Sequence, residues 1–140
     1  EEAKRIYPGI TPLFGDLKAE LMKATDNYGA DAIITACPVP SVQSSAVELA
    51  ALGGRVIFFG GIPAGKEPVG INTNLVHYKQ LVLSGTTRAS LAQYRKTLKY
   101  ISSGVLNVSP LITAHFGLRD IHSAIERAKN GIGLKNVINF

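Results

Sequence analysis

Hydrophobic positions along the chain follow two spacings, one typical of buried strands and one typical of amphipathic helices. Apolar runs that end in glycine or small polar residues predict strands at residues 55–59 and 81–84, and a further buried strand is predicted at 31–37. Because strands alternate with helical segments, the pattern predicts an α/β fold with a parallel sheet. The predicted helices span residues 16–27, 41–53, 90–103 and 120–130.

Capping residues mark the ends of these helices. Asp16 and Ser41 stand where a side-chain oxygen can accept hydrogen bonds from the first turn. Ser90, with Gln93 three residues later, matches a capping box. Glycine is the residue that most often ends a helix, and it occurs here at Gly53, Gly104 and Gly131.

The same spacing indicates which helix faces are buried, because residues three or four positions apart lie on one side of a helix. Leu17, Leu21 and Ala24 share one face of the first helix, and Leu91, Tyr94, Leu98 and Ile101 follow helical spacing in the third. In the last helix, Ile121, Ala124, Ile125 and Ala128 are expected to face inward.

Three further strands are predicted with shorter patterns. Residues 111–116 and 136–140 flank the last helix. Residues 11–14 contain Pro12, which cannot donate a ladder hydrogen bond, so a strand there is expected at a sheet edge.

Composition narrows the function classes. The chain has 140 residues, of which 46% are hydrophobic and 18% charged, as expected of one folded domain. The net charge is +5, but the basic residues are scattered, which favours solvated helix surfaces over a nucleic-acid interface. No apolar run reaches the roughly 20 residues of a membrane span. Cys37, the single cysteine, cannot form an internal disulfide, so we expect a reducing, cytoplasmic setting.

The strand at 55–59 is followed by Gly60 and Gly61, which suggest a ligand site. In open α/β sheets, ligands sit outside the carboxyl ends of the strands. Glycines at such an end leave room for a flat ring to approach main-chain amides.

Four segments, at residues 29–36, 53–63, 74–88 and 129–138, together resemble the nicotinamide half of the coenzyme domain in zinc-dependent medium-chain alcohol and polyol (sorbitol-like) dehydrogenases. The resemblance implies a partial Rossmann-like, doubly wound parallel sheet with flanking helices that lacks the first two strands. No Gly-x-Gly-x-x-Gly motif follows a strand. Residues 1–140 would thus form an incomplete NAD(P)-binding domain, with terminal segments that return towards a catalytic domain upstream.

The resemblance also assigns candidate cofactor-binding residues at the strand ends. It implies that Phe59, Gly60 and Gly61 meet the carboxamide of the nicotinamide ring. Thr86, Thr87 and Arg88 would form the second contact with the coenzyme, after the next strand.

Further candidate residues follow from the same resemblance. The turn at Ala36 and Cys37 would pass under the coenzyme ribose, and Lys135 would reach the pyrophosphate. Arg88 would also point towards substrate hydroxyls. Polyol dehydrogenases usually carry an aromatic residue after this arginine, whereas this chain has Ala89.

No residue in the sequence is identified as catalytic or metal-binding. His77, His115 and His122 lack the spacing of a metal site. The resemblance implies hydride transfer between an alcohol or polyol and NAD or NADP, with zinc bound outside this sequence. It also implies a homo-oligomer, because the family's outer strand, here 81–84, commonly pairs across a dimer axis. Two alternatives stay open: a zinc-free quinone or enoyl reductase of the same superfamily, and a non-catalytic folding or dimerisation fragment.

Overall fold

The computed structural model describes residues 2–140. The chain divides into two compact units, which are described separately. The first, here called the sheet unit, is Leu13–Arg88. The second, here called the terminal unit, is Ala89–Phe140 together with the described residues up to Pro12.

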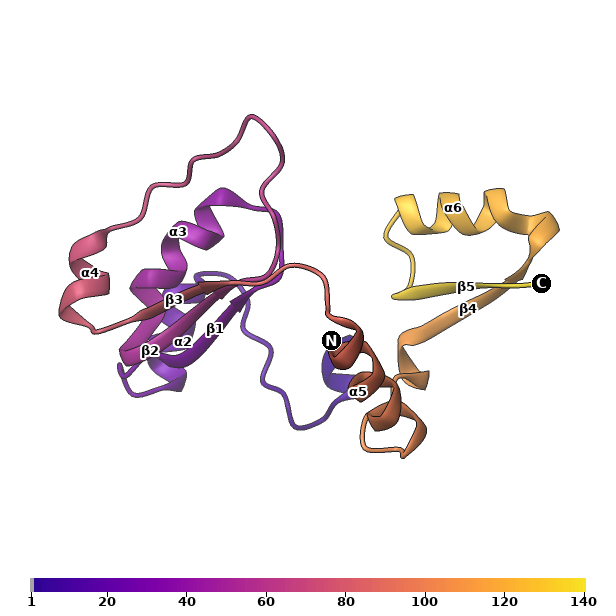
Figure 1. Cartoon of the computed structure of the whole chain (residues 1–140), viewed down its shortest axis with the longest axis horizontal. Helices are drawn as coiled ribbons and strands as arrows, with labels where there is room; N and C mark the ends of the chain where they lie inside the picture. The colour runs from indigo at the N-terminus through magenta and orange to yellow at the C-terminus, as the bar shows by residue number, and fades with distance from the viewer. Residues whose placement is uncertain (1) are drawn as a thin grey trace. The chain divides into compact units, whose positions relative to one another are not determined.

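The sheet unit is built on three parallel strands, which confirms the predicted α/β class (Figure 1). The strands are β1 (Ala30–Thr35), β2 (Ala50–Phe58) and β3 (Val82–Gly85), in the order β1-β2-β3. Both β1 and β3 are therefore edge strands. The helices of this unit are α2 (Leu17–Ala24), α3 (Pro40–Leu49) and α4 (Thr73–Tyr78).

The core of the sheet unit lies between α3 and the central strand β2. Val47 on α3 and Val56 on β2 are completely buried, and Leu81 closes the cluster just before β3. Small alanines at contact positions of α3 and β2 let the helix approach the sheet closely. The buried cluster is Ala46, Val47, Ala50, Val56 and Leu81.

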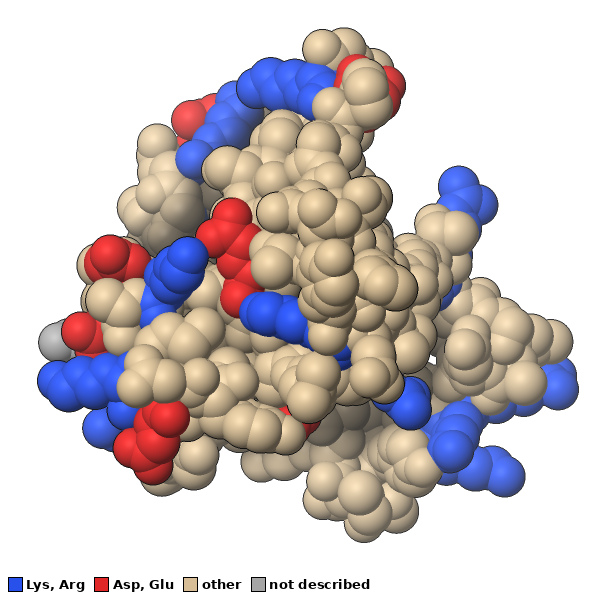
Figure 2. All heavy atoms as spheres, turned by 90° about the vertical axis from the view of Figure 1, so that its left-hand side faces the viewer, with Lys and Arg blue, Asp and Glu red and all other residues tan. Residues whose placement is uncertain are grey.

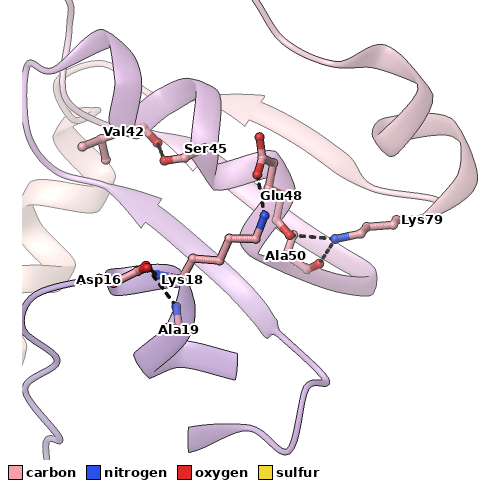
Figure 3. A network of polar contacts seen from close by, with 8 residues as sticks. All are labelled: Asp16, Lys18, Ala19, Val42, Ser45, Glu48, Ala50 and Lys79. Atoms are coloured by element: carbon pink, nitrogen blue, oxygen red, sulfur yellow. Dashed lines mark hydrogen bonds and ion pairs between the residues drawn. The ribbon is translucent and has the colours of Figure 1, made fainter. Parts of the chain in front are cut away.

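A polar network links α2, the end of α3 and the segment after α4 (Figure 3). The Asp16 carboxylate caps α2 by accepting from the backbone of Lys18 at 3.0 Å. The Lys18 ammonium pairs with Glu48 at 2.9 Å. The Lys79 ammonium donates to the carbonyls of Glu48 and Ala50, both at 2.8 Å, and so satisfies acceptors where α3 ends.

In the terminal unit, two parallel strands flank a helix. The Ser90 capping box is present in both directions, with Gln93 N donating to Ser90 Oγ at 3.2 Å and Ser90 N donating to Gln93 Oε1 at 2.8 Å. The two predicted strands around the last helix are confirmed and pair with each other. The elements are α1 (Glu2–Ile6), α5 (Leu91–Ser102), β4 (Ile112–Gly117), α6 (Ile121–Lys129) and β5 (Lys135–Asn139), with 3₁₀ turns at Ser109–Leu111 and Leu118–Asp120.

Two predictions from local sequence signals are wrong. Residues 11–14 form no strand. Ser41 does not cap α3: the N-cap is Val39, without a side-chain bond, and Pro40 takes the first helical position, where its missing N–H costs nothing. The same helix ends at Leu49 rather than at Gly53, because β2 already begins at Ala50.

Other predicted boundaries also shift. Helix α2 stops at Ala24 instead of residue 27, since Asp26 and Asn27 take left-handed φ values of 49° and 64°. The strand predicted at 31–37 spans Ala30–Thr35, and only Thr35 is buried along it.

The apolar helix faces that the sequence predicts are largely exposed in the structure. No residue of α2 or α5 is buried, and Leu91 on α5 is 63% exposed. Of the four expected positions on α6, only Ala124 is buried. Helical spacing in the sequence therefore predicts an apolar stripe on a helix, but it does not show whether another element packs against that stripe.

Figure 2 shows basic and acidic side chains interspersed over part of one face, beside a broad uncharged area, and basic side chains alone at its right-hand edge. Within residues 2–140, no helix is long and apolar enough to cross a membrane.

Candidate functional site

Three loops meet the same edge of the three-stranded sheet. Thr35 at the end of β1 pairs in register with Phe58 of β2, and Phe58 pairs with Gly85 of β3. Because the strands are parallel, the residues that follow each of them emerge at the carboxyl edge, where α/β sheets hold ligands. The structure thus brings together the predicted site residues Ala36, Cys37, Phe59, Gly60, Gly61, Thr86, Thr87 and Arg88.

Gly60 joins the loop after β1 to the loop after β2 through hydrogen bonds of its backbone. Its N–H donates to the Thr35 carbonyl at 2.7 Å, and its own carbonyl accepts from the buried Gln43 side chain at 2.7 Å. A Cβ at this position would lie only 2.8–3.0 Å from the backbone of Cys37. Glycine is therefore required here by the close approach of two backbones, rather than by an unusual φ.

The neighbouring positions are open. A Cβ on Gly61 would meet nothing within 4 Å, and the Phe59 side chain is 62% exposed. The Thr86 N–H donates to the Phe58 carbonyl at 3.2 Å, which continues the ladder beyond β3. Thr87 and Arg88 are exposed, and Arg88 has a left-handed φ of 54°. The loops after β2 and β3 are thus held in place by backbone bonds while their outer surfaces remain accessible.

Two polar residues at this edge were not predicted from the sequence. Gln43 is a buried residue of α3 whose side chain donates to the Gly60 carbonyl, and no local sequence signal marks this contact because it joins two separate elements. Thr35 is 2% exposed, and its Oγ1 has no hydrogen-bond partner within the described chain. A buried hydroxyl without a partner is unusual, and it lies at the end of β1, directly before Ala36.

Ala36 and Cys37 also border an apolar cavity of about 350 Å³ that lies beside β1. The Cys37 thiol is free and half-buried. The cavity is lined by Leu17, Ile33, Ile34, Thr35, Ala36, Cys37, Val42, Ser45, Ala46 and Leu49.

Lys135 belongs to the terminal unit, so its predicted role at the pyrophosphate stays a prediction. It is the first residue of β5 and is exposed. Its backbone N–H donates to Thr113 Oγ1 at 3.3 Å, which fixes the start of the strand.

The chemistry of the available donors does not suit zinc. Within residues 2–140, no three His, Cys, Asp or Glu side chains lie close enough together to hold a metal ion. His115 faces Asn139 at 3.5 Å, and the His77 ring stacks edge-on with Tyr78. A catalytic zinc therefore does not fit on the described residues.

The parallel sheet and its accessible carboxyl edge define an α/β fold of the nucleotide-binding kind. The sequence pattern of the zinc-binding dehydrogenase family matches residues 9–103, and the chain belongs to that family.

Curated relatives agree with this assignment. L-threonine 3-dehydrogenase of Bacillus subtilis is 31% identical over 109 residues, which are 76% of this chain and 30% of the relative. The enzyme of the same name from Pyrococcus furiosus is 30% identical over 124 residues, or 87% of this chain and 35% of the relative. A probable D-xylulose reductase A from Arthroderma otae is 28% identical over 110 residues, or 79% of this chain and 30% of the relative. The chain spans about a third of the length of the relatives it matches.

Solved structures share the fold. A short chain alcohol dehydrogenase from E. coli CFT073, crystallised with NADH, superposes with a TM-score of 0.79 at 21% identity, covering 99% of this chain and 41% of the other. Benzyl alcohol dehydrogenase from Acinetobacter calcoaceticus gives 0.75 at 17% identity, covering 89% and 34%.

Proposed function

We propose that this chain forms the nicotinamide side of the NAD(P)-binding domain of an oxidoreductase, which transfers a hydride between an alcohol or polyol and NAD or NADP. The observation that supports the proposal is the set of three loops that follow β1, β2 and β3 at one carboxyl edge. Membership of the zinc-binding dehydrogenase family and the NADH held by a structural neighbour support the choice of coenzyme.

Each loop has a distinct part in holding the coenzyme. Gly61 and Phe59 present an open backbone to the carboxamide, and Thr86 and Thr87 supply the second contact from the neighbouring strand. The turn at Cys37 supports the ribose. The bound coenzyme supplies the hydride chemistry, whereas this chain orients the ring, and orientation lowers the barrier by making the transfer effectively intramolecular.

Arg88 is proposed as the substrate-facing residue of the edge. Its left-handed backbone places an exposed guanidinium immediately after the Thr86–Thr87 loop. A guanidinium can donate hydrogen bonds to substrate hydroxyls through several N–H groups. Lys135, from the terminal unit, is proposed to bind the pyrophosphate.

The zinc named by the family is proposed to bind residues outside this sequence, because the described residues offer no ligand set. We further propose a homo-oligomer that pairs through the edge strand β3, and a cytoplasmic location consistent with the single free thiol.

Saturation-transfer NMR with the 140-residue chain and millimolar NADH tests the coenzyme proposal. Nicotinamide protons are expected to receive more saturation than adenine protons, because the proposed contacts lie at the nicotinamide. Gly61→Val should weaken the transfer. Gly70→Val is the matched control, since Gly70 also has nothing within 4 Å and lies at the other end of the same connection, just before α4, where its carbonyl accepts from Ser44 Oγ at 2.7 Å. Stronger transfer to adenine, or equal effects of both variants, would contradict the proposal.

An activity assay tests the second half of the proposal. The chain alone should show no turnover of alcohols or polyols with either coenzyme, even with added zinc, because the described residues contain no metal-ligand set. Turnover above background by the pure chain would contradict the proposal that the zinc binds residues outside this sequence.

A further inference from the structure

The terminal unit contains a second cavity, of about 600 Å³, at the carboxyl end of α6. Two arginines, Arg5 and Arg127, line it together with Thr113. Apolar side chains, among them Ile112 and Leu134, form another part of the wall. A cavity with two guanidinium groups and an apolar wall is suited to an organic anion.

Arg127 carries the main evidence. Its Nε is buried and has no hydrogen-bond partner within the described residues. Because a buried donor without an acceptor is costly, such a group is a candidate for binding something from outside the chain. Arg127 lies on α6, in the last turn before the helix ends at Lys129.

Gly133 keeps the space beside this guanidinium open. A Cβ on Gly133 would lie 3.7 Å from Arg127 Nη2 and would overlap Thr113 Oγ1. The Thr113 hydroxyl accepts from Leu134 N at 2.9 Å, and so holds the loop around the cavity in shape. Gly133 also has a left-handed φ of 78°, which glycine adopts without strain.

The cavity is lined by positive and neutral residues, and the acidic neighbour of Arg127 in the sequence is paired elsewhere. No Asp or Glu is among the described residues that line it. Glu126, which precedes Arg127, pairs with Lys129 at 2.7 Å.

We propose that this cavity binds a phosphate group of a small molecule, with the Nε and Nη2 groups of Arg127 donating to the phosphate oxygens. Arginine matches phosphate geometry because its N–H donors form a fixed fork. The apolar wall contacts the carbon part of the ligand. This site goes beyond the proposed coenzyme function, because the coenzyme loops lie in the sheet unit and Lys135, proposed for the pyrophosphate, does not line the cavity.

Titration of the 140-residue chain with inorganic phosphate at constant ionic strength, followed through the ¹⁵N signals of the arginine side chains, tests the site. The Arg127 Nε signal should shift and saturate. A parallel titration with acetate distinguishes phosphate from a carboxylate, such as an acidic side chain of another protein segment. Acetate binding as tight as phosphate binding would overturn the phosphate assignment, and a shift that never saturates would overturn the site itself.

Two variants complete the test. Arg127→Gln should weaken phosphate binding by about tenfold or more, because a charge-assisted fork is lost. Arg119→Gln removes the same charge from an exposed position of the terminal unit outside the cavity lining, and should change the affinity less than about twofold. Equal losses in the two variants would mean non-specific attraction. Since the wild-type titration reads Arg127 directly, the proposal is still tested if Arg127→Gln does not fold.

Discussion

The two units of this chain have similar sequence patterns but different interiors. Among the described residues, the sheet unit contains seven of the eight buried hydrophobic ones, including the fully buried Val47 and Val56. In the terminal unit only Ala124 is buried among the described hydrophobic residues, although α5 and α6 are both amphipathic. The amphipathic pattern of a helix therefore shows which of its faces can be buried. A core forms only where another layer of structure packs against that face.

The difference follows from the number of layers that each unit provides. Helix α3 packs on both β1 and β2, so its apolar face and the sheet bury each other. The terminal unit offers only the paired strands β4 and β5 to its helices. A two-stranded sheet presents little surface, which leaves the apolar side chains of α5 accessible.

The largest effect is expected in the core of the sheet unit. Val56→Ala should lower the free energy of unfolding by about 2–3 kcal/mol, through lost burial and the cavity left behind. Leu98→Ala on exposed α5 is the control and should cost less than about 0.5 kcal/mol. Urea denaturation measures both. A comparable loss for Leu98→Ala would show that α5 is packed in solution and would remove the contrast between the units.

The next effect concerns the two glycines at the carboxyl edge. Gly60→Ala should destabilise the chain by roughly 2 kcal/mol, because its Cβ would press on the Cys37 backbone. Gly61→Ala, one residue away, meets nothing within 4 Å and should be nearly neutral. Thermal unfolding followed by circular dichroism compares the two variants. Equal melting temperatures would refute the close approach of the first two loops.

Lys79 should contribute more to the sheet unit than Lys18. Lys79→Met removes two hydrogen bonds to the carbonyls of Glu48 and Ala50, and should cost about 1–2 kcal/mol. Lys18→Met removes only an exposed ion pair with Glu48, worth about 0.5 kcal/mol. Denaturation in low and high salt distinguishes the two contributions to the free energy of unfolding, since salt strongly screens only the exposed ion pair. The reverse ranking would contradict the polar network drawn in Figure 3.

The smallest effect is expected at the start of α5. Ser90→Ala removes the capping box and should cost about 1 kcal/mol or less of helix stability. Ser102→Ala, near the other end of the helix, serves as the control because its hydroxyl only donates back to the Lys99 carbonyl. Amide exchange in the first turn of α5 gives the measurement, and unchanged exchange for Ser90→Ala would argue against the cap.

Local signals in the sequence predicted much of the fold. Asp16 and the Ser90–Gln93 pair located two helix starts, because capping depends only on neighbouring residues. Ser41 misled for the same reason: Pro40 fixes the helix start one residue earlier by its own geometry. The strand expected at 11–14 did not form, since a strand also needs a partner, which local sequence cannot supply.

The candidate site was predictable where it depends on topology. Residues after parallel strands share one edge, so Gly61 could be placed there from the strand pattern, whereas Cys37 and Thr86 were assigned by the resemblance to the dehydrogenase family. Gln43 and the unpaired hydroxyl of Thr35 could not be predicted, because their roles arise from packing between separate elements.

Binding of the coenzyme at the carboxyl edge is tested most directly by an amide-resolved NMR titration of the chain with NADH. We expect weak, saturable shifts concentrated at Gly60, Gly61, Thr86 and Thr87, where the loops after β2 and β3 share one edge. Shifts confined to the terminal unit, or no shifts at millimolar NADH, would contradict the proposal that this edge receives the coenzyme.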